Sequence, residues 1–80
     1  MKLSIYSLKK ILFQGQAELL NCKTSMGEIT VLDNHEMFIG VLTAGPMKVV
    51  DTAKENHFFE VQSGFLEVKE ANEVRCIVEQ

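Results

Sequence analysis

Three neighbouring side chains could do chemistry. Asp33, His35 and Glu36 lie together in the run Asp-Asn-His-Glu. An imidazole beside carboxylates can act as a general base or bind a divalent metal. A general base also needs a nucleophile or a substrate pocket, and the chain carries no serine elbow and no activated-cysteine motif. If the segment is extended, residues 33 and 35 share a face and Glu36 points away, which splits the metal ligands. We therefore predict neither a catalytic residue nor a metal site here.

The other reactive side chains also favour a structural interpretation. Cys22 and Cys76 have no CxxC or histidine partner at metal-binding spacing, so they are predicted to be small buried residues. His57 lies in a predicted hairpin. No glycine-rich phosphate motif occurs, so no nucleotide or other cofactor is predicted.

Bulk composition predicts one globular domain over residues 1–80. Of the 80 residues, 46% are apolar, which suits a packed core. The net charge of −3 argues against binding to nucleic acid, which requires clustered basic residues. The longest apolar stretch, near Met37–Leu42, is far shorter than the roughly 20 residues of a transmembrane helix. The first residues lack the pattern of a secretory leader, so we expect a cytoplasmic chain.

These candidate residues must be positioned by strands, because apolar residues recur with a period of two. Alternation of this kind is typical of antiparallel sheets with one buried face. It occurs over residues 2–7, 27–32, 46–51, 58–62, 65–70 and 73–79. Turn signals separate the runs at Gly15 and at residues 24–27, 33–36, 44–46, 53–56, 63–64 and 69–72.

The predicted fold is all-β, a flattened two-layer antiparallel β-sandwich of about eight to ten short strands. The five phenylalanines are expected to supply much of the core, so Phe59→Ala or Phe65→Ala should each cost about 3 to 5 kcal/mol. Met47 fits a core face. Met26 and Met37 flank turns, where an exposed methionine hints at a protein contact.

The order of several motifs resembles the epsilon subunit of F-type ATP synthases, in its amino-terminal domain. The resemblance covers nearly the whole chain. The motifs are a first strand ending in Ser7, Phe13-x-Gly15, Gly27-Glu28-Ile29, a turn ending in His35, a passage ending in Gly45, and Gly64-Phe65-Leu66-Glu67-Val68.

The resemblance implies a sandwich domain and a non-catalytic role in the central stalk. Its partners would be the gamma subunit and the membrane rotor ring, and its role would be to couple ion-driven rotation to ATP synthesis. By position, Glu28 would face the ring loops, and Ser7, His35 and Gly40 would lie towards gamma. The implied location is peripheral, on the cytoplasmic face of the bacterial inner membrane.

Three departures from the family pattern matter. Asp33-Asn34 replaces the usual Pro-Gly before His35, and Glu36-Met37 follows it, so the turn is expected to differ in shape. The turn at residues 69–72 has one extra residue. The sequence ends at Gln80, where the sandwich ends, so a subunit naturally this short is expected to have no carboxy-terminal helical hairpin and to lack the inhibitory switch that this hairpin forms in many relatives. The alternative interpretation is a free-standing small β-sandwich that serves as a binding or accessory module.

Overall fold

A computed structural model describes all residues from 1 to 80 and consists of strands alone. There are eight: β1 (Lys2–Tyr6), β2 (Ile11–Thr24), β3 (Gly27–Leu32), β4 (Phe38–Leu42), β5 (Gly45–Asp51), β6 (Asn56–Val61), β7 (Ser63–Lys69) and β8 (Glu73–Glu79). No helix of the length and apolar character needed to cross a membrane is present.

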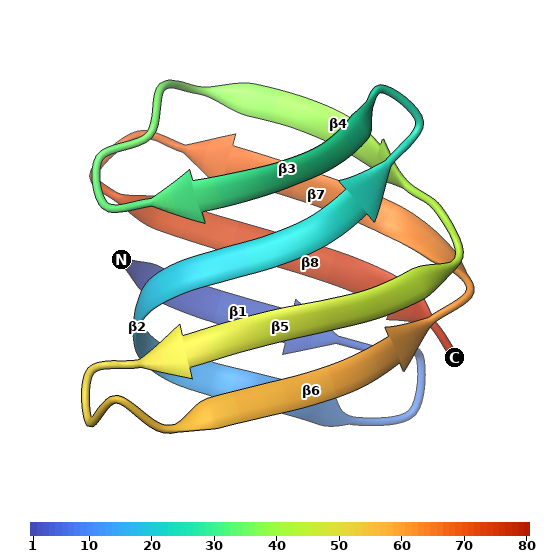
Figure 1. The fold of residues 1–80 in the computed structure, drawn as a ribbon, viewed down its shortest axis with the longest axis horizontal. Coiled ribbons are helices and arrows are strands. Elements are labelled where there is room, and N and C mark those ends of the chain that lie inside the picture. Colours follow the sequence, from blue (N-terminus) through green and yellow to red (C-terminus); the bar gives the residue numbers. More distant parts are fainter.

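The strands form two layers around one core, which confirms the predicted β-sandwich. One layer contains β3, the second half of β2, β5 and β6, and the other contains β4, β7, β8 and β1 (Figure 1). The molecule measures 25 × 23 × 19 Å, so the flattening is slight. Most pairs are antiparallel, whereas β1 and β8 run parallel, with Leu3 opposite Val74.

The second strand, β2, belongs to both layers. Its first half pairs with β1, where Gly15 lies opposite Leu3. Its second half pairs with β3 and β5, and its last residue, Thr24, pairs with Leu42 of β4. The prediction of a turn at Gly15 is therefore wrong, because this glycine lies within a continuous strand of 14 residues.

Aliphatic residues, not phenylalanines, fill the core. The largest fully buried side chains include Leu3, Ile5, Leu20, Leu42, Met47 and Leu66. Val31 is buried and Ile29 packs against the core from its edge, as their alternation predicted. Cys22 and Cys76 are buried free thiols, which confirms their structural interpretation. Burial raises the pKa of Cys22 to about 11 and raises that of Cys76 further.

The predicted core role of the phenylalanines needs correction. Phe13, Phe38 and Phe59 are only partly buried against the core. Phe58 and Phe65 are 66% and 60% exposed, because each precedes a residue of the same strand that faces inward. The expected 3 to 5 kcal/mol cost of Phe65→Ala therefore does not hold for this structure.

Candidate interaction surface

An apolar row crosses the outer face of the layer formed by β4, β7, β8 and β1. Val41 lies opposite Phe65, Phe65 opposite Ile77, and Ile77 opposite Tyr6. All these side chains point away from the core because their neighbours in sequence point into it. Val41, Phe65 and Ile77 are each about half exposed or more. Solvent-facing sheets usually carry polar residues at such positions, so this row marks a surface that a partner could cover.

A fully exposed leucine extends the apolar row at one end. Leu8 is 97% exposed and, with the row, lines a shallow hollow of about 310 Å³. It sits in the turn between β1 and β2, which Ser7 holds in shape. The Ser7 hydroxyl accepts hydrogen bonds from the backbone N–H groups of Lys9 and Lys10 at 3.3 and 3.2 Å. Ser7 thus acts on this surface by fixing the turn that presents Leu8.

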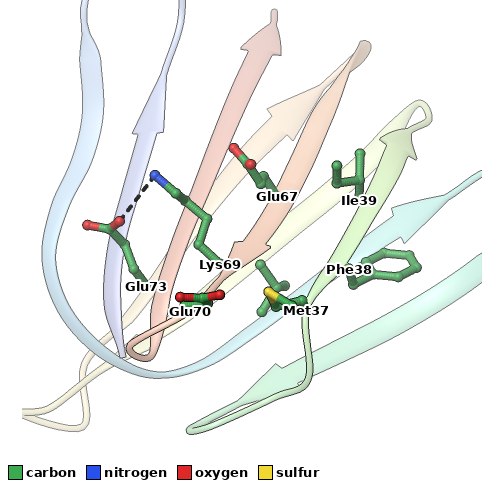
Figure 2. Close-up of a pocket in the computed structure, with 8 residues that line it drawn as sticks. Met37, Phe38, Ile39, Glu67, Lys69, Glu70 and Glu73 are labelled. Carbon is green, nitrogen blue, oxygen red and sulfur yellow. Dashed lines mark ion pairs between the residues drawn. The ribbon is translucent and has the colours of Figure 1, made fainter.

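A larger hollow, of about 690 Å³, opens on the same face near the other end of β4. Figure 2 shows Met37 and Ile39 on the β4 side and acidic side chains on the β7 and β8 side. Met37 and Ile39 are 66% and 75% exposed. The lining residues are Met37, Phe38, Ile39, Glu67, Val68, Lys69, Glu70 and Glu73.

His35 and Gly40 shape the β4 side of this face. The His35 ring lies edge-on to Phe38 with 6.5 Å between ring centroids, and its Nδ1 is 2.7 Å from the Glu36 carbonyl oxygen. Gly40 is buried, and the Phe38 ring folds over it. A Cβ on Gly40 would lie 2.6 Å from Cε2 of that ring. Gly40 therefore contributes to this surface indirectly, by leaving room for Phe38.

The turn before His35 is held by the β7–β8 turn and by the amino terminus. The backbone N–H of Asn34 donates to Oδ1 of Asn72 at 2.7 Å, and Nδ2 of Asn72 donates to Asp33 at 3.2 Å. The amino-terminal ammonium of Met1, and then Asn72, hold the pKa of the Asp33 carboxyl below its usual range. Asp33 is therefore a structural carboxylate that anchors the turn.

Glu28 lies apart from the other three predicted contact residues. It is exposed on β3, in the other layer, and its carboxylate accepts a hydrogen bond from Nδ2 of Asn21 at 3.0 Å. Ser7, His35 and Gly40 all belong to the layer of β4, β7, β8 and β1 or to loops beside it. The assignment of all four as contact residues stays a prediction.

The sequence did not single out one further cluster, in the β5–β6 turn. Ligand atoms of Asp51, Glu55 and His57 lie within 4.8 Å of one another. Asp51 accepts hydrogen bonds from the backbone N–H groups of Ala53 and Glu55 at 2.9 and 3.0 Å, and lies 2.8 Å from His57 Nε2. These contacts hold the turn together. No short sequence motif signals this cluster, because Asp51 and His57 are six residues apart.

The fold and surface define a class of protein: a small all-β sandwich domain with one partly apolar outer face. The chain belongs to the family of the ATP synthase delta/epsilon chain β-sandwich domain, whose pattern it matches over residues 1–80. This confirms the resemblance to the epsilon subunit.

Curated relatives agree with the family. The chain is 37% identical over 67 residues to an ATP synthase epsilon chain of Clostridium novyi, covering 84% of this chain and 51% of the relative. It is 33% identical over 69 residues to an ATP synthase epsilon chain of Hydrogenovibrio crunogenus, covering 86% of this chain and 47% of the relative. The chain thus spans about half the length of the curated relatives that it matches.

Solved structures share the fold. A chain in the mitochondrial ATP synthase of Euglena gracilis, in an assembly of OSCP, F1 and c-ring, superposes with a TM-score of 0.92 at 18% identity. The match covers all of this chain and 51% of that one. A chain in the central stalk and c-ring of the Tetrahymena thermophila mitochondrial ATP synthase superposes with a TM-score of 0.86 at 17% identity. This match covers 100% of this chain and 63% of that one.

Proposed function

We propose that this domain is a non-catalytic part of the central stalk of an F-type ATP synthase. It binds the gamma subunit and the membrane rotor ring, and it couples ion-driven rotation of the ring to ATP synthesis. It acts at the cytoplasmic face of the bacterial inner membrane, which it reaches through the complex. Family membership and the central-stalk assembly named for the Tetrahymena structure support this role.

The observation that carries the proposal is the apolar row on β4, β7 and β8. Val41, Phe65 and Ile77 adjoin across three strands while remaining exposed. A free-standing module without an obligate partner would have no need of such an exposed row. Contiguous exposed apolar side chains are typical of surfaces that a partner covers. We therefore assign this face, flanked by Ser7 and His35, to gamma, and the β3 surface around Glu28 to the rotor ring.

The test is binding of the purified gamma subunit of the same synthase. We expect Phe65→Ser to lower affinity by at least about tenfold, because truncation of a central aromatic residue removes a major part of interface energy. Phe58→Ser is the matched control, since Phe58 is equally exposed but lies in the other layer. Equal losses in both variants, or no binding by the unmodified protein, would contradict the assignment.

A further inference from the structure

We propose that the hollow between β4 and the β7–β8 hairpin receives a segment of a partner that places a lysine or arginine beside an apolar side chain. This inference rests on the proposed function, because it takes the gamma subunit as the partner and specifies the chemistry of its contacting segment. It adds an ionic contact at Glu70 to the apolar contact described above.

The apolar half of the hollow comes from two alternate positions around β4. Met37 and Ile39 point outward, whereas Phe38 between them packs against the core. Ile39 and Val41 are two residues apart on one strand, so the hollow continues directly into the apolar row. A methionine in this position can adapt to the shape of a partner side chain.

The charged half of the hollow has one carboxylate without a cation. Glu67 pairs with Arg75 at 2.9 Å, and Glu73 pairs with Lys69 at 3.4 Å. No ion pair or side-chain hydrogen bond engages Glu70, which lines the same end of the hollow as Met37 (Figure 2). Because the other two lining carboxylates are already paired with cations, Glu70 is the group that favours a cationic side chain of the partner here.

The shape of the hollow favours a protein segment over a small molecule. It opens along the surface of the sheet, whereas small-molecule sites enclose most of the ligand. A second copy of this chain is disfavoured by symmetry. In a two-fold dimer each patch meets itself, which would set Glu70 and its acidic neighbours against the same groups. Arginine beside apolar residues is a common composition at protein interfaces.

The experiment measures affinity for the purified gamma subunit at low and moderate salt, with Glu70→Gln and Glu70→Lys. We expect Glu70→Gln to weaken binding about three- to fivefold at low salt, as for one partly exposed ion pair. Glu70→Lys should weaken binding more than about tenfold, because the new lysine would face the cationic side chain of the partner. Both losses should shrink as salt rises. Glu60→Lys, an exposed glutamate of β6 in the other layer, is the matched control and should bind normally.

The outcomes separate this inference from the proposed function. If the unmodified protein binds gamma, Phe65→Ser binds it more weakly as expected and Glu70→Lys binds it normally, the ionic contact is wrong and the proposed function stands. If the unmodified protein does not bind gamma, both are wrong. Tighter binding by Glu70→Lys would show an acidic partner and overturn the inference. A change in self-association by Glu70→Lys in sedimentation, without a change in gamma binding, would also overturn it.

Discussion

Two glycines of this domain leave room for very different neighbours. Gly64 has φ +155°, and a Cβ there would collide with the backbone carbonyl oxygen of Ile77 and lie 3.0 Å from Cα of Val78. At Gly40 the added Cβ would meet only the Phe38 ring, which can swing outward. Backbone atoms of a paired strand cannot yield in this way. The glycine in the Gly-Phe-Leu-Glu-Val motif is therefore required by the approach of β8.

This contrast gives a prediction for stability. Gly64→Ala should lower the free energy of unfolding by about 3 kcal/mol, whereas Gly40→Ala should cost about 1 kcal/mol. Urea unfolding of the two variants beside the unmodified protein measures both values. A smaller loss for Gly64→Ala than for Gly40→Ala would show that the β7–β8 pair is not as close as described.

Asp51 gives a prediction for acid stability. Its hydrogen bond with His57, and then the backbone N–H of Glu55, hold the pKa of the Asp51 carboxyl below its usual range. The folded pKa is therefore below the unfolded value, which is about 3.9. The stabilisation is present above the unfolded pKa and disappears as pH falls through the folded pKa. The destabilisation by Asp51→Asn should be full at pH 5 to 7 and shrink below about pH 4.

Chemical denaturation across this pH range is the measurement for Asp51. Glu60→Gln is the control, because its carboxylate is exposed on β6 and takes part in no ion pair. A destabilisation by Asp51→Asn that stays constant from pH 7 to pH 3 would contradict the role of the ionised carboxylate in the turn.

At the scale of the strands, alternation located β1, β3 and β5 to β8 but missed β2 and β4, and it did not say which aromatic residue a strand buries. Phe58-Phe59 and Phe65-Leu66 are consecutive apolar pairs, and one member of each pair must face outward. The period of two does not say which one. In β7, Leu66 and Val68 face the core, so Phe65 faces out. Phe65, in the middle of the apolar row, was wrongly assigned to the core for this reason.

A core substitution in β2 and a surface substitution in β7 test this face assignment. Leu20→Ala should cost about 2 to 5 kcal/mol, because Leu20 is fully buried in β2. Phe65→Ala should cost less than about 1 kcal/mol, because its ring is mostly exposed. Thermal and urea melts of both variants provide the comparison. A loss at Phe65 as large as that at Leu20 would place this ring in the core after all.

At the scale of the whole molecule, the layered architecture was predictable and its closure was not. Short alternating strands in a chain of this length must form two layers to bury their apolar faces. The parallel pairing of β1 with β8, and the sharing of β2 by both layers, depend on contacts between distant segments. Gly15 looked like a turn residue because a local pattern cannot reveal that a strand continues into the other layer.

Glu28 gives a prediction for the assembled enzyme. Its carboxylate is exposed and makes one surface hydrogen bond with Asn21. Glu28→Arg should therefore change the free energy of unfolding by no more than about 0.5 kcal/mol. If Glu28 faces the rotor ring, the substitution should weaken coupled ATP synthesis in membrane vesicles. Normal synthesis in that variant would remove Glu28 from the contact residues, whereas a large fall in melting temperature would show a structural role.

The passage of β2 from one layer to the other has a mechanical consequence. Layers joined only by side-chain packing can shear past each other when opposite faces are pulled. Here the backbone of one strand is hydrogen-bonded into both sheets, so shear would have to break its ladders with β1 and β5. A force applied to one face would therefore be carried to the other through backbone hydrogen bonds as well as through side-chain packing.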